Sequence, residues 1–230
     1  PEIFLAQVRA MLKASEGLGN LRILLPMISS LPELEISKML INRAFEEIKE
    51  ECFDITLPPI GVMIEVPSAV YQAQELARHA DFLSVGSNDL TQYLLAVDRN
   101  NARVADLSHS LHPSVLRALV QVVEAAHSEN THVGICGELA GDPLAALLLM
   151  AMGFDSLSMS ATNLLRVKSA IRGITLAKAK ELLGEVIALP DTESILKAME
   201  RAVEEVGLER ILKPSVPEPD VTNAGCSDGS

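Results

Sequence analysis

The sequence predicts an α/β fold in which parallel strands alternate with helices. Short apolar runs, each the length of one buried strand, recur along the chain and are separated by longer segments with helical periodicity. These runs are apolar at nearly every position, which is typical of parallel strands in a sheet covered by helices. Five such runs can be recognised, fewer than the eight strands of a closed (β/α)8 barrel.

The strands are expected in apolar segments bounded by glycine, proline or polar residues. We predict strands at residues 21–28, 60–66, 82–85, 131–136 and 156–161. The first of them follows Gly17 and Gly19, which end the preceding helical pattern. The segment 82–85 is too short for a helix, has the length of a buried strand, and ends at Gly86.

The helices are expected where apolar residues recur at helical spacing. We predict helices at residues 1–14, from Ser30 to Glu51, from Pro67, and at 91–97, 114–128, 142–152, 163–171, 176–189 and 192–206. Ser30 and Glu33 have the spacing of a capping box. Pro67 suits the first position of a helix, and Asp142 followed by Pro143 suits a capped helix start.

The length is enough for one large α/β domain or two small ones, and the composition is acidic. The chain has 230 residues, 48% of them hydrophobic, and a formal net charge of −12. We expect one domain over residues 1–213 and a disordered tail over residues 214–230, where Pro, Ser, Gly and Asp dominate. The acidic balance argues against nucleic acid as a partner.

The cysteines and the apolar segments predict a cytoplasmic protein. Cys52, Cys136 and Cys226 are widely spaced and form no CxxC pair, which suits a reducing compartment rather than disulfides. The longest apolar stretch, residues 145–152, is far shorter than the roughly 18 residues that span a bilayer. We therefore expect no membrane partner.

Polar side chains follow four of the predicted strands at the point where each strand ends. They are Glu65, then Asn88 with Asp89, then Cys136 with Glu138, and finally Ser160. Ligands of parallel α/β sheets bind at the carboxyl ends of the strands, so this agreement predicts a site there. The alternative is that strand ends are polar because the following loops are exposed.

The segment of residues 81–101 suits a phosphate and a divalent cation. Asp89 can hold a hard cation, Asn88 can donate to a phosphate oxygen, and Arg99 can bind the phosphate through its guanidinium. The alternative is that Asn88 and Asp89 cap a helix and that Arg99 is a surface side chain.

Glu65 interrupts an apolar run, where a carboxylate is costly unless it is paired or bound to a metal. As a metal ligand together with Asp89 it would suit Mg²⁺, which prefers few protein ligands and a phosphate. The alternative is an ion pair with a nearby Arg or Lys. The five histidines are scattered along the chain, which disfavours zinc.

Cys136 lies between Gly134 and Gly137, which suggests close approach of the backbone to a ligand. A thiol with an ordinary pKa near 8.5 can supply a proton at neutral pH. The alternative is a small buried residue, which is common for cysteine. Glu138 is interpreted as an orienting group or a helix cap.

Three motifs in order resemble the phosphoenolpyruvate-utilising enzymes. The motifs are GVMIEVPSAV from Gly61, GSNDLTQYLLAVDRNN from Gly86 and GICGELAGDP from Gly134. The second is most similar to the phosphoenolpyruvate–protein phosphotransferases (Enzyme I), and the likeness runs to about residue 206. It implies the C-terminal phosphoenolpyruvate-binding domain, a partial (β/α)8 TIM barrel that contains about the last five strands.

The resemblance also implies a role for each site residue. Glu65 and Asp89 match the family's Mg²⁺ ligands, Asn88 and Arg99 match its phosphate-binding residues, and Cys136 matches its proton donor. The implied reaction is Mg²⁺-dependent transfer of the phosphoryl group of phosphoenolpyruvate to a protein histidine, which leaves pyruvate. Two phosphate-binding arginines of the family lie on early barrel strands that this sequence lacks, so this chain alone is expected to be inactive.

The implied partners are a phosphocarrier protein, bound through N-terminal domains that this sequence lacks, and a second copy of the chain in a homodimer. Three alternatives remain open at this stage. One is the equivalent domain of pyruvate phosphate dikinase or phosphoenolpyruvate synthase. Another is a pyruvate-type aldolase or lyase on a related barrel, which would not need Cys136. The third is a dimerisation module that is inactive on its own.

Overall fold

The computed structural model describes residues 1–101, 103–104 and 108–208, and the predicted tail lies outside them. Five parallel strands form one sheet in the order β1-β2-β3-β4-β5, so the predicted α/β fold is confirmed. The strands are β1 (Ile23–Leu25), β2 (Ile60–Ile64), β3 (Phe82–Gly86), β4 (His132–Cys136) and β5 (Ser156–Ser158). Strands β1 and β5 are the edges of an open sheet, as expected for a partial barrel.

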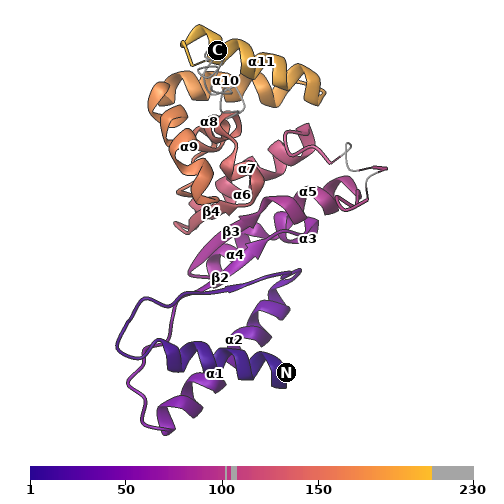
Figure 1. Cartoon of the computed structure of the whole chain (residues 1–230). Helices are drawn as coiled ribbons and strands as arrows, with labels where there is room; N and C mark the ends of the chain where they lie inside the picture. The colour runs from indigo at the N-terminus through magenta and orange to yellow at the C-terminus, as the bar shows by residue number, and fades with distance from the viewer. Residues whose placement is uncertain (102, 105–107, 209–230) are drawn as a thin grey trace, which may run out of the picture.

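Helices follow the strands in the order expected of β/α units. They are α1 (Glu2–Ala14), α2 (Leu31–Glu50), α3 (Pro67–Tyr71), α4 (Ala73–His79), α5 (Ser87–Leu95), α6 (Pro113–Ser128), α7 (Glu138–Gly141), α8 (Pro143–Met152), α9 (Ala161–Gly173), α10 (Leu176–Ala188) and α11 (Thr192–Glu205). Figure 1 shows α1 and α2 crossing at one end of the molecule, with α9, α10 and α11 grouped at the other. None of these described helices is long and apolar enough to cross a membrane.

The two faces of the sheet differ in composition because side chains alternate along each strand. One face consists of fully buried aliphatic residues that belong to the main core, and they are Val62, Ile64, Leu83, Val85 and Ile135. On the other face Met63, Ser84, Gly134 and Ser156 form one row across four strands. That second face is only partly covered, since Met63 and Ser84 are half-buried and Ser156 is exposed.

Four strands are shorter than predicted: β2 ends at Ile64 rather than at residue 66, β4 begins at His132 rather than at residue 131, and β1 and β5 differ most. Strand β1 ends at Leu25 because Pro26 has no N–H to donate and Met27 adopts a left-handed backbone with φ of 56°. Strand β5 ends at Ser158, and Ser160 is instead the residue before α9.

The third β/α connection is also tighter than predicted. Helix α5 begins at Ser87, directly after β3, so Asn88 and Asp89 lie inside its first turn and neither is its N-cap. The helix ends at Leu95 because Ala96 takes a left-handed conformation with φ of 52°. The predicted helix at residues 91–97 was therefore placed too late by about one turn.

The capping predictions had mixed outcomes. Asp142 accepts hydrogen bonds from the backbone N–H groups of Leu144 and Ala145, at 2.7 and 3.1 Å, as predicted. The capping box at Ser30 is wrong, because the Glu33 carboxylate instead accepts from the backbone N–H and the hydroxyl of Ser29. The helix start is still stabilised by Glu33, one residue earlier than the pattern indicated.

Candidate functional site

Glu65 lies directly after β2 and is 3% exposed. Its Oε1 accepts a hydrogen bond of 2.7 Å from the backbone N–H of Met27, in the turn that follows β1. The left-handed backbone of Met27 turns this N–H toward the carboxylate. The ion pair to Arg or Lys that was considered for Glu65 does not occur within the described part of the chain.

Asp89 comes from the next strand and meets Glu65. Burial raises the pKa of the Glu65 carboxyl, and the N–H of Met27 opposes this effect by stabilising the ionised form. The neighbouring Asp89 carboxyl group raises the pKa of Glu65 further, because its negative charge disfavours a second ionised acid close by. Two acidic side chains therefore share one small region at the carboxyl end of the sheet.

Gly86 makes room for this pair of carboxyl groups. A Cβ atom at this position would lie 2.8 Å from Oε2 of Glu65 and 3.1 Å from the sulfur of Met63. Any other residue at the end of β3 would therefore push Glu65 away from its position.

Arg99 reaches the same site from the segment that follows α5. Its Nη2 lies 3.2 Å from Oδ1 of Asp89, and its backbone N–H donates to the side chain of Gln92 at 3.2 Å. The Arg99 side chain is 41% exposed, so its remaining donors are open to solvent or to a ligand. Two carboxyl groups and one guanidinium thus lie together, and when both acids are ionised they carry one uncompensated negative charge.

Cys136 ends β4 and faces the same side of the sheet as Glu65. It pairs with Gly86 in the register of β3 and β4, and paired residues on neighbouring strands point to the same face. Its Sγ donates to the backbone carbonyl of Val85 at 3.4 Å, and the Ser84 hydroxyl lies 4.0 Å from the sulfur.

Asn88 connects the first turn of α5 to the start of α7. Its Oδ1 accepts a hydrogen bond of 3.2 Å from the backbone N–H of Glu138. The Glu138 side chain itself is exposed, at the first position of α7. A shallow pocket of about 400 Å³ opens beside these residues, and its wall includes Ser158, Ser160 and Asn163.

The structure therefore places Asp89 next to both Glu65 and Arg99, and it places Asn88 and Cys136 at the same end of the sheet. Ser160 lies at the rim, on the side of β5. The roles assigned to these residues remain predictions.

Sequence reasoning missed the part played by small residues between the strands. Gly134 and Gly137 were expected to let the backbone approach a ligand, but a Cβ at Gly134 would meet Ser156, and one at Gly137 would meet Ser87. A usable signal was present, because small residues recur at every second position, as in Ser84 and Gly86 or Gly134 and Cys136. That alternation indicates a strand face that neighbouring groups approach closely.

The donor set fits a hard divalent cation with few protein ligands. Over the described residues there is no group of three or more His, Cys, Asp or Glu side chains that could hold a metal. A site here would therefore rest on the carboxyl groups of Glu65 and Asp89, with remaining positions for water or a ligand, which is the coordination that Mg²⁺ prefers. The buried position of Glu65, next to a second acid, gives a cation a favourable place to bind.

An open parallel α/β sheet with acidic, amide and guanidinium groups at its strand ends belongs to the class of α/β proteins whose ligands bind at the carboxyl ends of the strands. Within this class the chain belongs to the phosphoenolpyruvate-utilising enzymes. Residues 1–176 match the family model described as the PEP-utilising enzyme, PEP-binding domain.

Characterised relatives support the same family. The chain is 49% identical over 183 residues to the "Phosphoenolpyruvate-dependent phosphotransferase system" protein of Escherichia coli K12, an alignment that covers 79% of this chain and 24% of the relative. It is 44% identical over 213 residues to the "Phosphoenolpyruvate-protein phosphotransferase" of Haemophilus influenzae, covering 92% of this chain and 36% of the relative. The chain thus spans about a quarter to a third of the length of these relatives.

Among solved structures, a citrate lyase from Burkholderia xenovorans LB400 resembles the fold. The TM-score is 0.55 at 17% sequence identity, and the match covers 93% of this chain and 71% of that one. At this identity the likeness concerns the fold alone.

Proposed function

We propose that this chain is the phosphoenolpyruvate-binding domain of a phosphoenolpyruvate–protein phosphotransferase. In the whole protein the phosphoryl group of phosphoenolpyruvate would pass to a histidine of the protein, with Mg²⁺ as cofactor. The observation that carries the proposal is the position of Asp89 next to both Glu65 and Arg99 at the carboxyl end of a parallel sheet. This arrangement would place a cation site next to a phosphate-binding group, and the family membership of the chain supports the same function.

Glu65 and Asp89 would hold Mg²⁺. When bound, the metal supplies positive charge that stabilises the transferred phosphoryl group and the enolate left behind. Glu65 is held in place by the N–H of Met27, so its carboxylate is oriented before any ligand arrives.

Arg99 and Asn88 would bind the phosphate of phosphoenolpyruvate. The Arg99 guanidinium already lies beside Asp89 and has further N–H donors in a planar fork that matches phosphate oxygens. The first turn of α5 adds backbone N–H groups, because Gly86 at its N-cap offers no side-chain acceptor.

Cys136 would supply the proton that converts the enolate into pyruvate. Its Sγ–H donates to the Val85 carbonyl, a contact available only to the protonated thiol. The thiol also faces the same side of the sheet as the two carboxyl groups.

The partners and the location belong to the same proposal. A phosphocarrier protein would receive the phosphoryl group through parts of the whole protein outside these 230 residues. A homodimer is proposed because the open edges at β1 and β5 favour association. A cytoplasmic location suits the free cysteines Cys52 and Cys136.

Calorimetry with phosphoenolpyruvate, with and without Mg²⁺, tests the proposal on the chain as it stands. We expect weak binding that requires Mg²⁺ or Mn²⁺. Without the two family arginines, each a charge-assisted contact of ~1.5–3 kcal/mol, affinity should be roughly 10²–10⁴-fold below that of a complete site.

Asp89→Ala should abolish the remaining binding, because it removes both a cation ligand and the partner of Arg99. The exposed Glu200→Ala variant is the matched control, since it removes one negative charge far along the chain. Tight binding that needs no metal, or equal binding by both variants, would contradict the proposal.

A further inference from the structure

The first turn of α5, after β3, and the residues that follow β4 are joined by contacts that the proposed chemistry does not require. The Ser87 hydroxyl donates to the backbone carbonyl of Cys136 at 2.8 Å, and Ser87 is only 1% exposed. Gly137 follows with a φ of 114°, and a Cβ there would lie 2.3 Å from the Ser87 oxygen. A residue with a side chain at position 137 would therefore displace the Ser87 hydroxyl.

A second contact runs in parallel and orients Asn88. Because its Oδ1 accepts from the N–H of Glu138 at 3.2 Å, the amide oxygen is already used. The NH₂ group of Asn88 is then the part left to face a ligand, and it can only donate. This orientation suits an anion such as a phosphate and disfavours a cation.

The carbonyl that Ser87 holds belongs to the residue that carries the thiol. Fixing this peptide fixes the direction of the Cα–Cβ bond of Cys136, and with it the position of Sγ 3.4 Å from the Val85 carbonyl.

We propose that Ser87 is a positioning residue, whose hydroxyl holds the Cys136 backbone so that the thiol keeps a set place relative to the phosphate-binding turn. The role of Cys136 as proton donor rests on the proposed function. The positioning itself concerns the thiol and can be measured without phosphoenolpyruvate.

The test measures alkylation of Cys136 by iodoacetamide in a Cys52→Ser, Cys226→Ser background, in which Cys136 is the remaining thiol. Ser87→Ala should raise the alkylation rate constant about 2- to 10-fold, as expected for the loss of one hydrogen bond.

Thr91→Val is the matched control. The Thr91 hydroxyl is also buried in α5 and donates to the carbonyl of Ser87 at 2.7 Å, but it does not touch Cys136. If the role of Ser87 is merely structural, both variants should have a lower melting temperature. The rate constant for alkylation of Cys136 should then be unchanged in both. Equal alkylation rates in Ser87→Ala and Thr91→Val would therefore overturn the proposal.

If Ser87→Ala fails to fold, Gly137→Ala makes the same test from the other loop and should give the same rise in rate. An unchanged rate in a folded Gly137→Ala chain would also overturn the proposal. A changed rate in a chain that does not bind phosphoenolpyruvate would support the positioning role and contradict the proposed function.

Discussion

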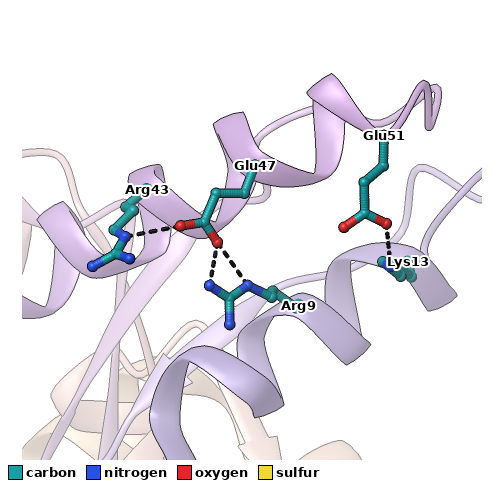
Figure 2. Close-up of polar contacts among 5 residues, drawn as sticks. All are labelled: Arg9, Lys13, Arg43, Glu47 and Glu51. Carbon is teal, nitrogen blue, oxygen red and sulfur yellow. Dashed lines mark hydrogen bonds and ion pairs between the residues drawn. The ribbon is translucent and has the colours of Figure 1, made fainter. Parts of the chain in front are cut away.

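Two glutamates of this chain, one on the α1–α2 surface and one at the end of β2, show opposite electrostatic arrangements. Figure 2 shows Glu47 of α2 between two guanidinium groups, with one oxygen bound by Arg9 of α1 and the other by Arg43. The Nε atoms of Arg9 and Arg43 lie 2.7 and 2.8 Å from these oxygens. Hydrogen bonds from Arg9, and then from Arg43, lower the pKa of Glu47.

Glu65 has the reverse surroundings. It is buried, its partner in hydrogen bonding is a backbone N–H, and its nearest charged neighbour is another acid, Asp89. The α1–α2 surface also pairs Lys13 with Glu51, so charges there are matched within the chain. At the strand ends one negative charge is left over, and this is the difference expected between a structural contact and a binding site.

The largest expected effect is the loss of metal binding in Glu65→Gln. The substitution keeps the size of the side chain and removes one of two charged cation ligands, so Mn²⁺ affinity should fall by roughly 10- to 150-fold, using ~1.5–3 kcal/mol for a charge-assisted contact. Titration followed by electron paramagnetic resonance measures the free Mn²⁺. Glu47→Gln is the control. An equal loss of Mn²⁺ affinity in both variants would show that Glu65 is no more a cation ligand than Glu47.

The pH dependence of metal binding should be the next largest effect. Mg²⁺ needs Glu65 in its ionised form, and the pKa of Glu65 is raised above its ordinary value, mainly by burial. Affinity should therefore fall as the pH decreases through this raised pKa, whereas an unperturbed carboxyl group would remain ionised there. Calorimetric titrations with Mg²⁺ between pH 4.5 and 7.5 (roughly the range between ordinary carboxyl and histidine titrations) would follow this change, and a flat profile would contradict it.

The same two glutamates should make opposite contributions to stability without metal. The folded-state pKa of Glu65 lies above its unfolded value, so its contribution to the free energy of unfolding decreases as pH rises between the two values. The folded-state pKa of Glu47 is lowered, so its contribution is present above the unfolded value and is lost as pH falls through the folded value. Melting temperatures of Glu65→Gln and Glu47→Gln against pH would separate the two, and parallel curves would refute the comparison.

The ion pairs of Glu47 should contribute only modestly to stability. They are partly exposed, and such pairs stabilise a protein little because solvent screens the charges and both long side chains must be ordered. Glu47→Gln should therefore lower the melting temperature by a few degrees at low salt, and by less in 1 M NaCl, a concentration that screens charges beyond about 3 Å. If the decrease in melting temperature does not depend on salt, Glu47 stabilises the chain through packing between α1 and α2 instead.

The smallest effect on binding is expected from Cys136→Ala. The proton is delivered after the phosphoryl group has left, so the thiol contributes little to holding phosphoenolpyruvate. Affinity measured by calorimetry should stay within about twofold of the unsubstituted chain, since one weak contact is lost. A loss as large as that of Asp89→Ala would show that Cys136 binds the ligand rather than donating a proton.

Local pattern was enough to predict the sheet and to predict that Glu65, Asp89 and Cys136 lie at the carboxyl ends of its strands. The apolar runs of β2, β3 and β4 were recognised because burial on a covered sheet leaves a local signature, and Glu65, Asp89 and Cys136 stood out because each interrupts or ends such a run. The ends of β1 and β5 were less predictable, because apolar residues also occur in the turns beside them.

By itself, the sequence determined which residues lie at the carboxyl edge of the sheet. A residue lies there because an apolar strand segment comes directly before it, and that segment can be recognised locally. Tertiary structure alone decided what those residues touch. The N–H of Met27 on Glu65, the carboxyl group of Asp89 beside it, and the hydroxyl of Ser87 on Cys136 all join segments far apart in the chain. Such contacts depend on strand register and on how closely Gly86 and Gly137 let neighbouring strands approach, and no local pattern encodes either.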